Sequence, residues 1–140
     1  MTLNECLSAV AEFQETFGLP MENTPTARLN EDIIALRHRL MAEENDEYIE
    51  AAKAGDMVEI ADALGDMLYI LCGTIISHGM QDVIGDVFST IQASNMSKLG
   101  ADGQPIYRED GKVMKGPDYF RPDIAGVLDR AGVTAATADR

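Results

Sequence analysis

The stretch "MAEENDEYIEAAKAGDMVEIADALGDMLY" (residues 41–69) carries two acidic clusters, one on each side of a break at Gly55 and Asp56. Glycine commonly ends a helix and aspartate commonly caps the next one, so the stretch predicts two helices joined by a tight turn. Helices joined by so short a connection pack as antiparallel neighbours. The candidate site therefore depends on which way these carboxylates point.

The acidic residues before the turn lie partly on the apolar side of their predicted helix. At about 100° per residue, Leu40 shares one face with Ile33 and Leu36. Asp46 and Glu50 lie well off the centre of that face, and we expect them to face water. Three other acids continue the apolar face, each within roughly 60° of Leu40: Glu43, Glu44 and Glu47.

The acidic residues after the turn repeat this pattern. Glu59, Asp62 and Asp66 fall on one face of the helix, and Tyr69 lies about 60° from Asp66. The remaining circumference is largely apolar: Ile60, Leu64, Met67, Leu68 and Leu71. A helix this apolar is typical of a central position. Two solvated acidic faces are the simplest alternative, but this arrangement favours carboxylates that line a cleft.

The two acidic faces would lie abreast in the antiparallel pair. Like charges repel strongly in a low-dielectric cleft unless a cation neutralises them. Oxygen-only ligands favour Mg²⁺ or Mn²⁺ over Zn²⁺. A di-iron carboxylate bundle would need Glu-x-x-His elements, and neither His38 nor His78 lies three residues after a glutamate. The sequence therefore predicts a site for hard divalent cations.

Composition limits the partners of this protein. Hydrophobic residues make up 46% of the 140 residues, which is typical of a globular domain. A formal net charge of −13 argues against nucleic-acid polymers and anionic membranes as partners. We expect no leader and no membrane span. Cys6 and Cys72 have no zinc-site spacing, so we expect reduced, buried thiols in a cytoplasmic protein.

The sequence predicts a single all-α domain, a bundle of four main helices with a small C-terminal β-hairpin and loop extension. Asp110-Gly111 favours a type I′ hairpin turn. Pro122 begins a short final helix, and the tail from residue 133 is expected to fray. The main helices are expected at residues 2–17, 30–54, 56–78 and 81–99. The domain, residues 1–140, divides into an N-terminal helix and arm (1–29), a metal-binding helical core (30–99), and the hairpin with the C-terminal extension (100–140).

Basic residues are concentrated after the acidic helices. Of the 11 lysines and arginines, five lie between Lys98 and Arg121. Asn95 and Lys98 are three residues apart at a helix end and share a face. Lys98, Lys112 and Lys115 could neutralise phosphate oxygens opposite the metal site. They could also decorate a solvated hairpin or pair with a neighbouring subunit.

The acidic elements resemble a known family. "EENDE" (residues 43–47) followed by "DALGDMLY" (residues 62–69) is similar to the MazG-like and phosphoribosyl-ATP pyrophosphohydrolase-like all-α nucleoside triphosphate pyrophosphatases. The segment "SNMSKLGADGQPIYREDGKVMKGPDYF" (residues 94–120) resembles a bacterial and phage subgroup, some members of which favour deoxyuridine triphosphate. The resemblance extends from about Asn30 to Leu128.

The resemblance implies metal ligands. Glu43, Glu44 and Glu47 match the EExxE carboxylates that bind Mg²⁺ in the family, and Asp66 matches its downstream aspartate. The chain departs from the family at Ala63, where many members have glutamate. Asp62 is our choice for the missing ligand because it lies one turn before Asp66, and Glu59, two turns before, is the other acid available.

The resemblance also implies a reaction and substrate contacts. A nucleoside triphosphate and water would give the monophosphate and pyrophosphate, with Glu43 or Glu44 as the general base. Asn95 and Lys98 correspond to residues near substrate, together with bases of the hairpin; Tyr69 either lines the pocket or packs in the core. Members of the family form dimers or tetramers, so a homodimer or homotetramer is expected.

Two other readings of the sequence remain. The leading substrate is deoxyuridine triphosphate, whose hydrolysis would serve nucleotide-pool housecleaning. The first alternative keeps the same reaction but has phosphoribosyl-ATP, an intermediate of histidine synthesis, as the substrate. The second is a non-catalytic helical protein that binds nucleotides or other partners, which Ala63 favours because an expected ligand is missing.

Overall fold

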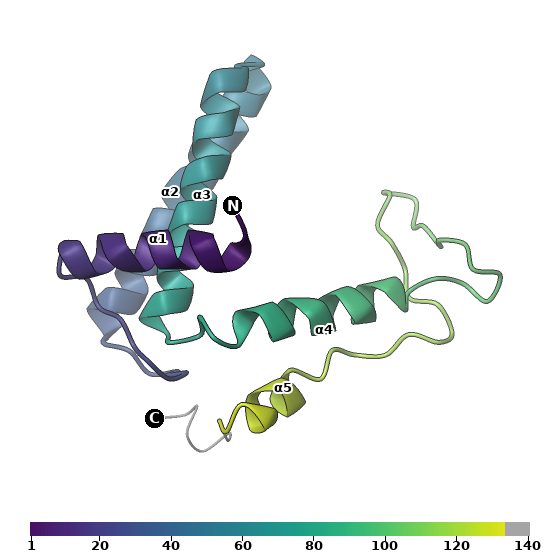
Figure 1. Cartoon of the computed structure of the whole chain (residues 1–140). Coiled ribbons are helices and arrows are strands. Elements are labelled where there is room, and N and C mark those ends of the chain that lie inside the picture. The colour runs from purple at the N-terminus through teal and green to yellow at the C-terminus, as the bar shows by residue number, and fades with distance from the viewer. Residues whose placement is uncertain (134–140) are drawn as a thin grey trace. The chain divides into compact units, whose positions relative to one another are not determined.

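The computed structural model describes residues 1–133, and this part of the chain is helical (Figure 1). No strand occurs within residues 1–133, so the predicted all-α class is confirmed. The helices are α1 (Leu3–Thr16), α2 (Glu31–Ala54), α3 (Met57–Ser77), α4 (Ile84–Met96) and α5 (Ile124–Arg130).

Local capping explains where the first three helices begin and where α2 ends. Thr2 and Glu5 form a capping box at the start of α1. Asn30 caps α2, which ends at Gly55 with a left-handed φ of 67°. Asp56 then caps α3 by accepting a hydrogen bond from a backbone N–H of its first turn. The tight turn predicted between the acidic helices is therefore present.

The described residues group into two compact units, residues 1–82 and 83–133. In the first unit, α2 and α3 pack along one another and α1 packs on α3 (Figure 1). The buried apolar residues of this unit are small or medium in size: Leu7, Val10, Ala51, Ala63, Cys72 and Ile76. The single domain predicted over residues 1–140 stays a prediction.

The arm between α1 and α2 is tied to the C-terminal end of α3. Buried Gln14 donates from Nε2 to the Pro20 carbonyl (3.1 Å), and Ser77 Oγ donates to the same oxygen (3.1 Å). Further along, the Thr26 N–H donates to the His78 carbonyl (2.8 Å). These bonds satisfy buried polar groups and fix the arm against the helices.

The structure corrects the predicted burial of α3. Leu64, Leu68 and Leu71 are 49%, 51% and 44% exposed, so the other helices of the first unit leave this apolar face uncovered. By length and composition alone, α3 could cross a membrane. Its three carboxylates on one face argue against a bilayer setting, because charged side chains are costly there. The exposed leucines instead form an uncovered face of a helix pair.

The second unit contains α4, α5 and the irregular segment between them. Asp123 caps α5, near the short helix predicted after Pro122. Helix α4 is shorter at both ends than predicted, beginning at Ile84. Buried Ser94 donates from Oγ to the Phe120 carbonyl (2.8 Å), which ties α4 to the chain before α5. The tail predicted to fray lies, apart from its first residue, outside the described residues.

The structure does not support the predicted β-hairpin. Tyr107 and Val113 form one isolated antiparallel bridge, with no strand on either side within residues 1–133. A type I′ turn needs positive φ at two central residues, whereas only Gly111 has it (86°). The Gly111 N–H donates to the Arg108 carbonyl (2.9 Å). The turn is therefore a three-residue loop with one left-handed glycine.

Candidate functional site

Glu44 lies at the centre of the acidic residues on α2 and α3. It is partly buried, and this desolvation is the main cause that raises the pKa of its carboxyl group. The charges of Glu47, Asp66 and Asp62 raise it further. The structure therefore brings together four of the five predicted metal ligands, two from each helix of the antiparallel pair.

The carboxylate of Glu44 also has an unsatisfied atom. Its Oε2 is buried and has no hydrogen-bond partner in the part of the chain that the structure describes. Ionised carboxylates only accept hydrogen bonds, so Glu47 can pair with Glu44 only when one of them carries a proton. A proton on this carboxylate or a bound cation would satisfy this oxygen.

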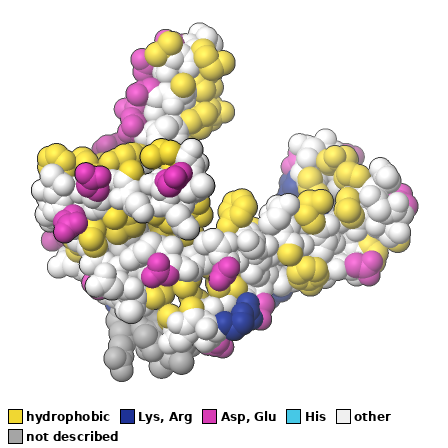
Figure 2. Space-filling model, in the orientation of Figure 1, with side chains coloured by type: hydrophobic (Ala, Val, Ile, Leu, Met, Phe, Trp, Pro, Cys, Tyr) yellow, Lys and Arg dark blue, Asp and Glu magenta, His cyan; other side chains and the backbone are white. Residues whose placement is uncertain are grey.

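A cleft lined by acids lies beside Glu44, toward the turn that joins the two helices. It has a volume of about 440 Å³, and its lining includes carboxylates from both helices: Glu47, Glu50, Asp56, Glu59 and Asp62. Figure 2 shows acidic side chains gathered along one edge of the α2–α3 pair, with hydrophobic side chains along the other. The sequence predicted this acidic cleft from the facing of the two helices.

Two residues of the cleft were missed by the sequence analysis. Glu50 was expected to face water because it lies roughly 80° from Leu40 on the helical wheel. It remains exposed but borders the cleft, since the cleft is open and lies near the end of α2. Asp56 was recognised only as a helix cap. The position of Asp56 at the turn between two acidic helices could have predicted that it borders the cleft.

Glu43 has different surroundings from Glu44. Its carboxylate lies 4.0 Å from Arg39 Nε, and both side chains are more than half exposed. This pair spans one turn of α2 and is worth little in water. Glu43 is also not among the charges that raise the pKa of Glu44, so its role as a ligand or base stays a prediction.

Ala63 occupies the position at which the resemblance of the sequence leads us to expect an acid. It is 1% exposed, so the small side chain allows close packing of α3 at this point. Its neighbour Asp62 is exposed and contributes to the raised pKa of Glu44. The structure thus gives Asp62, one residue earlier, a position among the acids that surround Glu44.

The fit to a metal ion rests on the chemistry of these side chains. Within residues 1–133 no three Asp, Glu, His or Cys side chains already form a ready coordination group. The unpaired Glu44 Oε2 and the carboxylates around it nevertheless supply the oxygen donors that Mg²⁺ and Mn²⁺ use.

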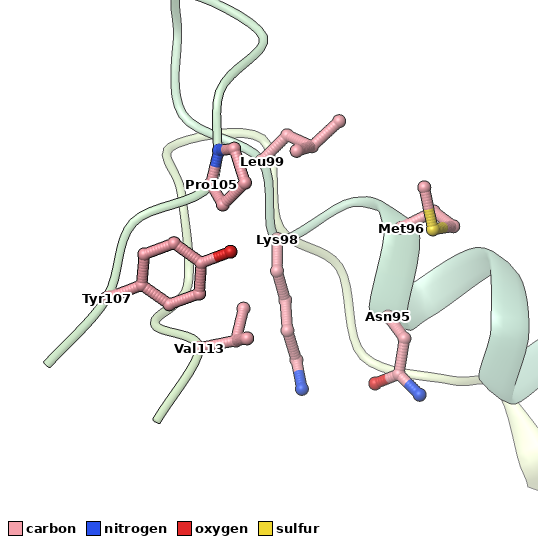
Figure 3. Close-up of a pocket in the computed structure, with 7 residues that line it drawn as sticks. All are labelled: Asn95, Met96, Lys98, Leu99, Pro105, Tyr107 and Val113. Carbon is pink, nitrogen blue, oxygen red and sulfur yellow. The ribbon is translucent and has the colours of Figure 1, made fainter. Parts of the chain in front are cut away.

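A second cavity lies within the second unit and contains two of the predicted substrate contacts. It measures about 410 Å³ and is lined by Asn95, Lys98, Tyr107 and apolar neighbours. Figure 3 shows the ends of the Asn95 and Lys98 side chains extending in the same direction, with the Tyr107 ring across from Lys98. Tyr107 was missed because it lay in the predicted hairpin, where it had no assigned role.

The other predicted substrate contacts lie outside this cavity. Lys112 is exposed on the turn before Val113. Lys115 is also exposed, with its Nζ 4.7 Å from the centre of the Tyr119 ring. Tyr69 belongs to the first unit and makes an edge-to-face contact with Phe13, with ring centres 5.6 Å apart. Tyr69 also borders a smaller cavity near the acids.

A model of the phosphoribosyl-ATP pyrophosphohydrolase family matches residues 10–95, which include the acids of both helices and end before Lys98. Uncharacterized protein L479 of Acanthamoeba polyphaga mimivirus is 37% identical over 80 residues, 55% of this chain. This chain spans 30% of that protein's length. A crystal structure from Exiguobacterium sp. 255-15, whose name proposes an NTP pyrophosphohydrolase, is 30% identical, with 91% of this chain and 95% of that one covered and a TM-score of 0.48.

Proposed function

Because this chain belongs to the phosphoribosyl-ATP pyrophosphohydrolase family, we propose that it hydrolyses a nucleoside triphosphate to the monophosphate and pyrophosphate. The observation that carries this proposal is the group of acids around Glu44, which lies within the residues that match the family. The bond between the α-phosphorus and the oxygen that bridges to the β-phosphate breaks. Water supplies the oxygen that the monophosphate gains.

We propose Mg²⁺ as the cofactor, with Mn²⁺ as a substitute. Glu44, Glu47, Asp62 and Asp66 would hold it, joined by Glu43 after a change of rotamer. When bound, divalent cations neutralise phosphate oxygens and lower the pKa of water. The overall charge of −13 makes cations necessary for an anionic substrate to approach this face.

Other steps of the proposed reaction, the proton transfer and the binding of phosphate oxygens, are assigned to residues of the chain. A carboxylate accepts the proton of the attacking water, and Glu44 is favoured over Glu43 because it lies among the other acids. Asn95 and Lys98 offer an amide and an ammonium group at one cavity. Lys112 and Lys115 are further cations for phosphate oxygens. The contacts of these four residues with substrate rest on the resemblance of residues 94–120 to the subgroup.

We propose deoxyuridine triphosphate as the leading substrate. The role of the protein would then be to remove this nucleotide from the cytoplasmic nucleotide pool. Phosphoribosyl-ATP is the second candidate, because the family that matches residues 10–95 is named for it. Both substrates carry a triphosphate that is cut at the same position. The two differ in the base, uracil or adenine, in the sugar, and in the phosphoribosyl group that only the second carries, so a panel of substrates distinguishes them.

We also propose that the protein is a homodimer or homotetramer. The exposed leucines of α3, Leu64, Leu68 and Leu71, leave an apolar surface that a second copy would cover. Obligate interfaces are more apolar than ordinary protein surface, which fits this face.

The proposal is tested by incubating the purified protein with Mg²⁺ and a panel of nucleoside triphosphates and phosphoribosyl-ATP. Pyrophosphate and orthophosphate are measured separately. Pyrophosphate without orthophosphate is expected, with deoxyuridine triphosphate turned over fastest. Orthophosphate as the product, or no turnover of any substrate, would contradict the proposal, and the second outcome would favour a non-catalytic binding protein.

A further inference from the structure

A small cavity lies where α1, α2 and α3 meet in the first unit. Its volume is about 210 Å³, smaller than the roughly 300–1,000 Å³ typical of sites for whole drug-sized ligands. The lining is mostly apolar and aromatic, with one cationic and one amide side chain: Val10, Phe13, Gln14, Leu19, Arg37, Leu40, Tyr69 and Ile70. The cavity therefore fits a flat, ring-sized fragment of a larger ligand.

The cavity adjoins the acidic residues along both helices. Leu40 lies four residues before Glu44 on α2, and Tyr69 lies three residues after Asp66 on α3. One helical turn, roughly 5.4 Å, thus separates the cavity from the acids. A nucleotide with its phosphates at the acids has its sugar and base within reach of the cavity.

Arg37 is the only charged side chain in the cavity lining. It is partly buried, its Nε donates to Thr74 Oγ1 (3.1 Å), and its Nη2 donates to the Ile70 carbonyl (2.9 Å). A guanidinium group has five N–H donors and no acceptor, so these two bonds leave three donors. No carboxylate within residues 1–133 forms an ion pair with it.

We propose that this cavity binds the base of the nucleotide and that Arg37 selects a pyrimidine with a carbonyl oxygen at C4 over one with an amino group. This inference rests on the proposed function and adds a base-reading residue to it. Uracil and thymine present carbonyl acceptors that a guanidinium can satisfy, whereas the amino group of cytosine is a donor that opposes another donor. Phe13 and Tyr69 supply aromatic surface beside the ring.

The positions of the Arg37 and Gln14 side chains require a glycine at position 73. A β-carbon at Gly73 would collide with the Gln14 amide and with the Arg37 guanidinium. The Gln14 amide is itself bonded to the Pro20 carbonyl (3.1 Å). Close packing on α3 and two hydrogen bonds therefore fix the position of the Arg37 guanidinium group. Its remaining N–H donors consequently have a defined direction.

The test compares deoxyuridine and deoxycytidine triphosphates, which differ only at this edge of the base. Arg37→Met removes the donors, and Arg37→Lys keeps the charge but loses the planar fork. The wild-type protein should prefer the uracil substrate in kcat/KM, and both variants should lose about tenfold to hundredfold of that preference, mainly through KM. Arg28→Met, which changes an exposed arginine of the arm, should leave the ratio unchanged.

A measurement on the wild-type protein separates this inference from the proposed function. Deoxyuridine, which has no phosphate, is titrated into the protein without metal and followed by NMR. Chemical-shift changes should centre on Leu40, Tyr69 and Arg37 whether or not any nucleotide is hydrolysed, and this result decides the matter if neither Arg37 variant folds. Shifts confined to other regions, or a substrate ratio that both folded variants retain, would overturn the inference.

Discussion

Glu44 on α2 and Asp66 on α3 lie together across the antiparallel helix pair, and the charge of Asp66 is one cause of the raised pKa of Glu44. Each residue lies in the interior of its helix, so the turn at Gly55 and Asp56 and the packing of the two helices together bring them close. Acidic residues from two separate segments of the sequence therefore form one group of carboxylates in the structure.

The first prediction concerns pH and the metal-free protein. The folded-state pKa of Glu44 lies above its ordinary value of 4.5, so the folded protein retains a proton that the unfolded chain releases. The stability from this group is complete below pH 4.5 and is lost as pH rises through the folded pKa. Glu44→Gln should remove part of that loss.

Urea unfolding between pH 4.5 and 8 in the presence of a chelator measures this effect. The free energy of unfolding of the unmutated protein should fall more steeply than that of Glu44→Gln over this range. Glu50→Gln, which changes an exposed acid of the same helix, is the matched control. The same slope in the unmutated protein and Glu44→Gln would contradict the assigned environment of Glu44.

The second prediction concerns Asp62. Asp62→Asn should weaken Mg²⁺ binding by about tenfold or more, as measured by calorimetry, because the amide removes a charge from the acidic group. Glu59→Gln lies one turn away and gives the comparison, since Glu59 lines the cleft but is not among the causes of the raised pKa of Glu44. Unchanged affinity in Asp62→Asn would remove Asp62 from the proposed ligands.

The third prediction concerns Ala63, which stands where the resemblance of the sequence leads us to expect an acid. Ala63→Glu should not restore a ligand, because this position is 1% exposed. An unpaired carboxylate there should lower the free energy of unfolding by about 3–5 kcal/mol. Ala63→Ser is the control for a small polar side chain. If Ala63→Glu instead bound Mg²⁺ more tightly without loss of stability, the helix packing described here would be wrong.

The fourth prediction concerns Gly73 and the cavity near the acids. Gly73→Ala should displace Gln14 or Arg37 and lower the free energy of unfolding by about 1–3 kcal/mol, as expected for overpacking. Gly65→Ala is the matched control, because a β-carbon at Gly65 meets nothing within 4 Å. Chemical denaturation of both variants checks this, and equal stabilities would contradict the close packing at Gly73.

The fifth prediction concerns the exposed leucines of α3. Leu64→Ser combined with Leu68→Ser should shift the protein toward a monomer in analytical ultracentrifugation, because both side chains are about half exposed in the single chain. Val58→Ser, at an exposed site nearer the start of α3, is the comparison. An unmutated protein that is already monomeric at high concentration would contradict the proposed assembly.

The helices and their boundaries could largely be predicted from the sequence. Capping chemistry is local, so Thr2, Asn30, Gly55 and Asp56 place helix ends without knowledge of tertiary structure. The facing of Glu44 and Asp66 was also predictable, because helical periodicity and one short turn determine it.

The features that were missed depend on tertiary packing or on backbone angles. Glu50 was assigned to solvent by periodicity, but an open cleft also admits side chains from the edge of a helical face. The type I′ turn failed because Asp110 keeps a negative φ and only Gly111 is left-handed. The place of Arg37 in the cavity could not be predicted from the sequence, because it depends on the absence of a side chain at Gly73, which lies on another helix.

The most direct test of the central claim is to hydrolyse deoxyuridine triphosphate in ¹⁸O-labelled water with Mg²⁺ and to weigh both products by mass spectrometry. Attack at the α-phosphorus predicts one ¹⁸O atom in the monophosphate and none in pyrophosphate. The Glu44→Gln protein should form neither product at a measurable rate while keeping its helical circular dichroism. Label in pyrophosphate, or in orthophosphate released from the triphosphate, would contradict the account.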